Sequence, residues 1–234
     1  GCIYKGVVKN IVPAVDGIFV DIGIGKNAFL RRKDLLNEKR FPTEGSPILA
    51  QVTKSDTDMK GALITEKISM FGKYAVTLSG TGYIGVSKKI RQESVRKRLK
   101  EIGKEICAEH MGLIIRTAAE NADMDEFRKD ITRLKENWDI IQKRFRMEKS
   151  PTLLYRESDI IVKALRDYVN KGTEILITDN RKIYERICKL NESEHTMEPD
   201  KILLYKERMP LLKKEKIEGQ IHLLFKRRVE LPSG

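Results

Sequence analysis

The sequence predicts a mixed α+β protein, with a small five-stranded β-barrel at its N-terminal end and helices and strands after it. Three observations support this fold class. Short apolar runs separated by glycine and proline turns occupy residues 1–68. An apolar seam with helical period covers residues 124–145, and strand-like and helix-like segments alternate from about residue 160.

Length and composition bound the class of protein. At 234 residues the chain is long enough for one large domain or for two to three small ones. Its 46 Lys and Arg exceed its 34 Asp and Glu, which gives a formal net charge of +12. This excess favours polyanionic partners through counterion release, and a basic, solvated surface without a specific partner explains it equally well.

Cysteine usage and hydropathy exclude several further classes. Cys2, Cys107 and Cys188 are far apart and form no metal-binding or disulfide pattern, which favours reduced thiols in a cytoplasmic protein. No apolar run approaches the roughly 18 residues of a membrane span, and no signal peptide is visible. Because the chain lacks an initiator Met and begins inside a strand-like pattern, we expect a piece of a longer protein.

The first 68 residues predict the barrel. Apolar residues alternate with polar ones, and Gly and Pro punctuate the expected strands at 3–11, 18–23, 28–30, 48–52 and 60–65. Five strands within about 70 residues suit an OB-type barrel. Phe19 and Phe29, two strands apart in a lysine-rich segment, suit stacking on single-stranded nucleic acid, and core packing is the alternative for both rings.

The middle of the chain predicts a hairpin and a helix. Residues 71–78 and 83–86 are strand-like and joined by a Gly-rich connection, so we expect them to pair. A basic helix is expected next, with Ser87 as its N-cap and Gly103 as its end. Its charged face is more typical of a solvated surface than of a binding site.

Residues 111–118 predict a buried strand that ends in Arg116 and Thr117. A guanidinium and a hydroxyl side by side can hold a phosphate, because the guanidinium donates two parallel hydrogen bonds and the hydroxyl one more. Arg-Thr pairs are common, however, and most are structural. The dipeptide alone therefore leaves both interpretations open.

The second half predicts a long helix and then an α/β segment. The helix has Asp123 as its cap and an apolar seam over 124–145, which favours packing onto a sheet over a coiled-coil interface. After it we expect helices and strands in alternation, with Ser158 capping the first helix and Gly172 ending it. The expected elements are a helix from 158, a strand at 174–178, a helix at 180–190, a strand at 202–205, a helix at 210–225 and a strand at 228–231.

Several strings along the chain carry a family resemblance. The opening residues resemble an S1 RNA-binding domain, and the whole chain resembles the ribonuclease E/G family of bacterial endoribonucleases. The match runs almost end to end and is specific because of the order and spacing of its strings. These strings are IYKG, FVDIG, NAFL, KGALIT, GLIIRTA, RESDIIVKALRDY and VELPSG.

The resemblance implies a division of the chain and a set of RNA contacts. Residues 1–68 would be the S1 domain, 69–160 the 5′-sensor region, and 161–234 a truncated C-terminal part of an RNase H-like domain. The implied partner is single-stranded RNA, preferably with a 5′-monophosphate. In the S1 domain, the residues that would touch RNA are Phe19, Phe29 and Lys60.

The resemblance also assigns roles at the 5′ end of the RNA. Arg116 and Thr117 would hold the terminal phosphate, and Gly72 and Val76 would line the first nucleotide. Lys88 and Lys89 stand where the family usually carries basic residues, often arginines. Lysine keeps the charge there but loses the bidentate geometry of arginine.

No catalytic residue is expected in this chain. Metal-dependent hydrolysis needs converging carboxylates, and the acidic groups at 123–126 and 157–159 are more typical of helix caps. The resemblance implies that the parent enzyme, expected to be a homo-oligomer, carries its catalytic aspartates, Mg²⁺ and a structural Zn²⁺ beyond residue 234. We therefore expect this chain, which has no cofactor of its own, to bind RNA without cleaving it.

Two alternatives from other classes stay open. One is a non-catalytic S1 protein that binds single-stranded RNA without preference for the 5′ end. The other is a scaffold that assembles through the 124–145 seam and binds RNA only weakly, with a steep salt dependence.

Overall fold

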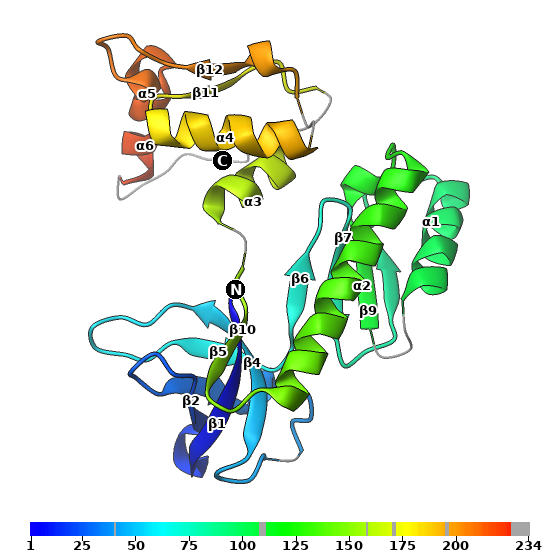
Figure 1. Ribbon diagram of the computed structural model, residues 1–234, viewed down its shortest axis with the longest axis vertical. Coiled ribbons are helices and arrows are strands. Elements are labelled where there is room, and N and C mark those ends of the chain that lie inside the picture. Colours follow the sequence, from blue (N-terminus) through cyan, green and yellow to red (C-terminus); the bar gives the residue numbers. More distant parts are fainter. Residues whose placement is uncertain (40, 108–110, 158, 170–171, 195–196, 226–234) are drawn as a thin grey trace. The chain divides into compact units, whose positions relative to one another are not determined.

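The computed structural model describes the chain except for residues 40, 108–110, 158, 170–171, 195–196 and 226–234 (Figure 1). The chain divides into two compact units, residues 1–157 and 158–234. Each unit has its own apolar core. Among the described residues, no helix is both long and apolar enough to cross a membrane.

The first unit opens with the expected barrel. Its strands follow the order β1-β2-β3-β5-β4, and pairing of β1 with β4 closes it. All pairs are antiparallel except β3–β5, so the barrel is mixed, as in an OB-type fold. The strands are β1 (Ile3–Val12), β2 (Gly17–Asp21), β3 (Ala28–Arg31), β4 (Pro47–Lys54) and β5 (Leu63–Thr65).

Strand alternation separates the barrel core from its outer surface. Ile18 and Val20 of β2 and Leu30 of β3 are fully buried in the core. Because successive side chains of a strand point to opposite faces, the residues between them face outward. The sequence left Phe19, which lies between Ile18 and Val20, open between the core and the outer surface, and strand alternation in the structure decides its side.

One strand of this sheet was not predicted. β10 (Thr152–Tyr155) pairs antiparallel with β1 and extends the barrel sheet. It directly follows Pro151 and the long helix, and a run of four residues is too short to show a period. Tertiary pairing with β1 decides its conformation.

A second sheet follows the barrel, and its topology corrects the predicted hairpin. The order is β6-β7-β9-β8, so β9 lies between β7 and β8, which do not pair with each other. β7 instead forms a hairpin with β6 on its other side. The strands are β6 (Ser69–Phe71), β7 (Ala75–Ser79), β8 (Ile84–Val86) and β9 (Met111–Ile115).

The prediction failed because it relied on sequence proximity. The Gly-rich connection at residues 80–83 suits a tight turn, but it leaves room for a third strand between its ends. β9 fills that gap, antiparallel to β7 and parallel to β8. A parallel neighbour needs a long crossover, which α1 (Glu93–Ile106) provides.

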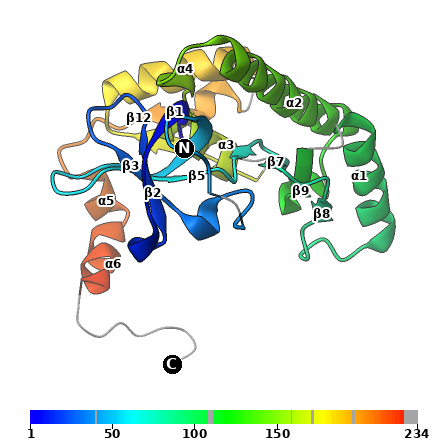
Figure 2. The ribbon, with the colours of Figure 1, turned by 90° about the horizontal axis from the view of Figure 1, so that it is seen from below.

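Two helices cover one face of this sheet (Figures 1 and 2). α1 and α2 (Met124–Met147) bury apolar residues against Leu113 and Ile115, which point to the same face of β9. α1 continues through Gly103, contrary to the prediction that the helix ends there. A Cβ on Gly103 would lie 3.1 Å from Leu113, so this glycine allows close packing of helix on sheet. Gln92, not Ser87, precedes the first turn of α1.

The long helix matches its prediction. Asp123 is the N-cap, and its Oδ1 accepts hydrogen bonds from the N–H groups of Asp125 and Glu126. The apolar seam packs onto the second sheet and its neighbours, as expected for a sheet-covering helix. The buried apolar residues of the seam are Phe127, Ile131, Leu134 and Ile141.

The second unit is a small α/β segment. β11 and β12 pair in parallel, with α4 as the crossover between them. The predicted single helix at 210–225 is two helices, with Lys216 at φ +56° between them. The elements are α3 (Ile160–Tyr168), β11 (Leu176–Thr178), α4 (Arg181–Glu194), β12 (Ile202–Leu204), α5 (Leu211–Lys214) and α6 (Ile217–Leu224).

Two predictions for this unit concern residues outside the described part of the chain. They are the capping role of Ser158 and the strand at 228–231. Asp159 is the N-cap of α3, since its Oδ1 accepts the N–H of Ile161. α3 ends at Tyr168, four residues before the predicted end at Gly172.

Candidate nucleic-acid interface

Three chain segments meet at one edge of the second sheet. Ile115, the last residue of β9, pairs with Val86, the last residue of β8, and with Ala75, the first residue of β7. The residues that follow β8, those that follow β9 and those that precede β7 therefore lie side by side. This edge contains five of the six residues predicted to bind the 5′ end of RNA, and Val76 comes next on β7.

Arg116 is hydrogen-bonded to the loop between β6 and β7. Its backbone N–H donates to the carbonyl of Tyr74 at 2.8 Å, and its Nη1 donates to the carbonyl of Gly72 at 3.0 Å. The side chain is half-buried, so its guanidinium is held by the fold and still reaches the surface. This is the arrangement of a pre-oriented cationic fork.

Thr117 and the two lysines lie on the other side of this edge. The hydroxyl groups of Thr117 and Ser87 are 2.9 Å apart and share a hydrogen bond. Lys88 and Lys89 follow Ser87 in an exposed turn. The parallel pairing of β8 with β9 thus brings two ammonium-bearing residues next to the Arg116–Thr117 pair.

An apolar row borders the edge on the sheet face that the helices leave open. Val76 pairs with Phe71 on β6 and with Ile114 on β9, and these three side chains share that face. Phe71 is 46% exposed and Ile114 is 40% exposed. A nucleoside beside the cationic groups would find apolar contact on this row.

Two side chains from α2 shape the loop that Arg116 contacts. The hydroxyl of Tyr74 donates to Glu126 at 2.5 Å, and the backbone N–H of Tyr74 donates to Asp130 at 2.8 Å. Burial and this bond to Glu126 raise the pKa of the Tyr74 hydroxyl, so it stays protonated as a donor. Sequence reasoning missed Ser87, Tyr74 and Asp130 as parts of this site.

The barrel carries a second cluster of predicted residues. Phe19 and Phe29 are directly paired on the adjacent strands β2 and β3, not two strands apart, and their ring centroids are 5.4 Å apart. A Cβ on Gly17 would lie 2.2 Å from the Phe29 ring, so this ring lies against the outer surface of β2. Lys60 is exposed in the segment that leads into β5, beside β3.

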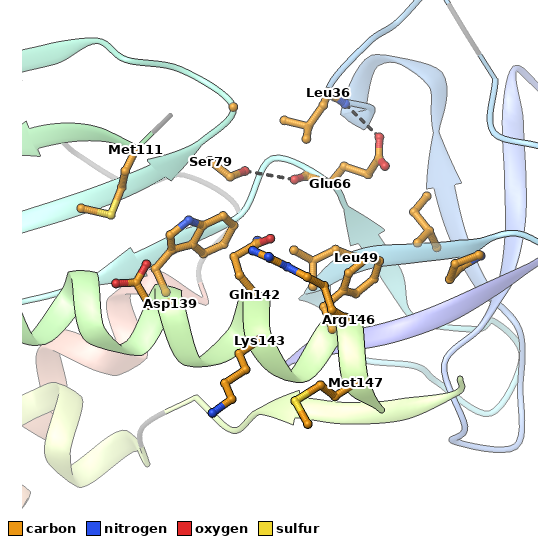
Figure 3. Close-up of a pocket in the computed structure, with 15 residues that line it drawn as sticks. Leu36, Leu49, Glu66, Ser79, Met111, Asp139, Gln142, Lys143, Arg146 and Met147 are labelled. Carbon is orange, nitrogen blue, oxygen red and sulfur yellow. Dashed lines mark hydrogen bonds between the residues drawn. The ribbon is translucent and has the colours of Figure 1, made fainter. Parts of the chain in front are cut away.

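A cavity of about 820 Å³ is lined by residues of the barrel, of the second sheet and of α2 (Figure 3). Gln142 and Arg146 of α2 extend toward Leu49 of β4 along it. Burial raises the pKa of Glu66 on its rim, and the N–H of Leu36 donates to this carboxyl. None of the predicted site residues lines the cavity, so we place the candidate interface at the sheet edge and the barrel face.

The described residues contain no group of three or more His, Cys, Asp or Glu side chains arranged to hold a metal ion. The acidic groups noted in the sequence act as helix caps, namely Asp123 on α2 and Asp159 on α3.

Comparison with known proteins identifies the family. The model of the ribonuclease E/G family matches residues 69–234. Ribonuclease G of Escherichia coli strain K12 is 32% identical over 251 residues, which cover 100% of this chain and 51% of that protein. Ribonuclease E of Buchnera aphidicola subsp. Schizaphis graminum is 33% identical over 252 residues, covering 99% of this chain and 26% of that protein.

A further relative extends the same picture. Ribonuclease E of Haemophilus influenzae is 32% identical over 252 residues and again 26% of it is covered. This chain thus spans about half the length of ribonuclease G and about a quarter of ribonuclease E. The family match covers most of the chain, including the whole second sheet and its edge, and the chain belongs to the ribonuclease E/G family.

Proposed function

We propose that this chain is the RNA-binding and 5′-end-sensing part of a bacterial endoribonuclease of the ribonuclease E/G type. Its ligand is single-stranded RNA, and it prefers an RNA with a 5′-monophosphate. The observation that carries the proposal is the convergence of Arg116, Thr117 and the Lys88–Lys89 turn at one edge of the second sheet.

The chemistry of this edge suits a terminal phosphate. The guanidinium of Arg116 supplies parallel N–H donors, and the Thr117 hydroxyl supplies another polar contact. A phosphate monoester carries about −1.5 to −2 charge at neutral pH, whereas an internal diester carries about −1. Several cationic groups around one position therefore favour the terminal monophosphate over internal phosphates.

The apolar row next to this edge supports a nucleotide as the ligand. Val76 and its strand neighbours offer contact to the first base or ribose, while the cationic groups hold the phosphate. A free phosphate ion would contact the cationic groups and leave the apolar row without a ligand.

The barrel supplies binding that does not depend on the 5′ end. Two aromatic rings on the outer surface of neighbouring strands can stack on bases of any sequence, and Lys60 adds a positive charge nearby. We assign the general affinity for single-stranded RNA to this face. We assign the preference for one 5′ end to the sheet edge.

For the longer protein we propose cleavage of single-stranded RNA in RNA processing and decay. The names of the relatives, ribonuclease G and ribonuclease E, support the ribonuclease activity in this proposal. The described part of this chain contains no cluster of side chains that fits a catalytic metal. Our proposal for the chain itself therefore contains binding and recognition, and no cleavage step.

The test compares two short fluorescent RNAs that differ only in a 5′-monophosphate or a 5′-hydroxyl, at fixed salt. The wild-type chain should bind the monophosphate RNA more tightly by roughly 1.5–3 kcal/mol, or about ten- to a hundredfold, as expected for a charge-assisted hydrogen bond. Arg116→Ala should abolish this difference, and Arg116→Lys should restore only part of it because the bidentate fork is lost.

Arg98→Ala is the matched control, because Arg98 is exposed on α1 and its loss changes the net charge equally. This substitution should slightly lower the affinity for both RNAs and leave the ratio of the two affinities unchanged. Equal affinities of the folded wild-type chain for the two RNAs would contradict 5′-end sensing. They would instead support a general S1-type RNA-binding module, which the half-buried phenylalanine pair on the outer surface of the barrel favours.

A further inference from the structure

The loop between β6 and β7, residues 72–74, is held from one side by two carboxylates of α2. Asp130 accepts the backbone N–H of Tyr74 at 2.8 Å, and Glu126 accepts the Tyr74 hydroxyl at 2.5 Å. Glu126 and Asp130 are four residues apart, so they lie one above the other on the same face of the helix. Tyr74 is thus hydrogen-bonded to α2 through both its main chain and its side chain.

Asp130 is buried to an extent that is unusual for a charged residue. Its exposed fraction is 7%, and its carboxylate lies directly against the backbone of Gly72. A Cβ on Gly72 would be 2.3 Å from Oδ2 of Asp130, so no larger residue fits at position 72 while Asp130 keeps its place. Arg133, at 3.0 Å from Oδ1, balances the charge from the solvent side.

The same loop holds Arg116 from its opposite side. The Gly72 carbonyl accepts Nη1 of Arg116, and the Tyr74 carbonyl accepts the Arg116 backbone N–H. Three residues of loop therefore connect the buried carboxylate of Asp130 to the guanidinium of Arg116. A shift of the loop away from α2 moves both acceptors that orient this arginine.

We propose that Asp130 is a positioning residue for 5′-end recognition, acting through the 72–74 loop on Arg116. This inference rests on the proposed function of the sheet edge. Burying a charged carboxylate costs free energy, which its partners must offset. The Asp130 carboxylate accepts hydrogen bonds from the Tyr74 N–H and from Arg133, and the first of these bonds holds the 72–74 loop.

Two substitutions remove the acceptor and one keeps it. Asp130→Ala deletes the carboxylate, and Asp130→Leu deletes it while filling its volume, which protects the core should alanine unfold the chain. Asp130→Asn keeps the size and an oxygen that accepts the Tyr74 N–H. Asp139→Ala is the matched control, because Asp139 is exposed on the same helix and its loss changes the net charge equally.

The measurement is the affinity of each variant of this 234-residue chain for the 5′-monophosphate and the 5′-hydroxyl RNA, with circular dichroism as the check on folding. Asp130→Ala and Asp130→Leu should lower the monophosphate-to-hydroxyl preference by about tenfold, since displacements of about 1 Å at a recognition site have effects of this size or larger. The affinity for the hydroxyl RNA should stay within about twofold of wild type. Asp130→Asn and Asp139→Ala should keep the wild-type preference.

The outcomes separate this role from a merely structural one. A preference that persists in folded Asp130→Ala or Asp130→Leu overturns the positioning role while leaving 5′-end sensing intact. If the Asp130 variants lose affinity for both RNAs to the same extent, the positioning role is also overturned, because a general loosening of the fold explains such a loss. Equal affinities of the wild-type chain for both RNAs overturn 5′-end sensing itself, and the role of Asp130 with it.

Discussion

Single residues show how side-chain direction separates function from packing. The sequence left Phe19 and Phe29 between a place in the barrel core and a stacking role. Their neighbours Ile18, Val20 and Leu30 fill the core, so the two rings point to the outer surface and meet there. The strand period would have supported this, because residues of odd and even number face opposite ways.

At this scale we predict that the phenylalanine pair contributes to RNA affinity without reading the 5′ end. Phe19→Ala and Phe29→Ala should each weaken the binding free energy for the monophosphate RNA and for the hydroxyl RNA by the same amount. We expect about 1–3 kcal/mol, the usual effect of losing one base-stacking ring. Fluorescence anisotropy with the same two RNAs measures this.

Tyr83→Leu is the control, since Tyr83 is a 66% exposed ring at the opposite end of β8 from Lys88. It should leave both affinities near wild type. A change in the ratio of the two affinities after Phe19→Ala would show that the barrel also senses the 5′ end, contrary to our assignment.

Secondary-structure elements show where local signals suffice and where they do not. The long helix α2 was predictable, because its cap and its apolar seam are both local patterns. β10 was not, and the order of β7, β8 and β9 was predicted wrongly. Pairing between strands far apart in sequence depends on the contacts available after folding, and no local period encodes it.

The end of α2 illustrates such a contact and yields a prediction at this scale. Arg144 donates hydrogen bonds to the carbonyls of Leu153 and Leu154 and thereby fastens β10 to the helix. Arg144→Ala should destabilise the first unit by about 1–2 kcal/mol through the loss of these bonds. Urea unfolding followed by circular dichroism measures the change.

Arg146→Ala, an exposed substitution on the same helix, should have little effect. Arg144→Lys should recover little of the loss, because an ammonium does not reproduce the planar fork that reaches two carbonyls at once. Equal stability of Arg144→Ala and wild type would show that the Arg144 hydrogen bonds do not help to hold β10 against α2.

At the level of the whole molecule, most of the net positive charge lies in the unit that contains the proposed RNA contacts. Residues 1–157 contain 30 of the 46 Lys and Arg residues and 21 of the 34 Asp and Glu residues. The first unit therefore carries most of the net charge of +12. This distribution favours RNA binding by the first unit.

We predict a salt dependence that differs between the two RNAs. Binding of both should weaken as salt rises, and the plot of log affinity against log salt should be steeper for the monophosphate RNA by roughly one unit, because its terminal phosphate adds charge that the site neutralises. Titrations at four salt concentrations measure both slopes. In Arg116→Ala the two slopes should coincide, whereas identical slopes in the wild type would argue against a cationic site for the 5′ end.

The sequence by itself determined the fold class, the long helix and the family of this chain. These depend on local periodicity, on caps and on strings whose order can be read directly. It also named Arg116 and Thr117, though only the family resemblance separated them from an ordinary dipeptide.

Only the tertiary structure decided which segments meet. It inserted β9 between β7 and β8, which brought Ser87 to Thr117 and the 72–74 loop to Arg116. It also revealed Asp130, which reads in the sequence as one more acidic residue on a charged helix. The physical reason is that the strand pairing and the buried polar contacts that build this site join residues distant in sequence, whereas sequence patterns report only near neighbours.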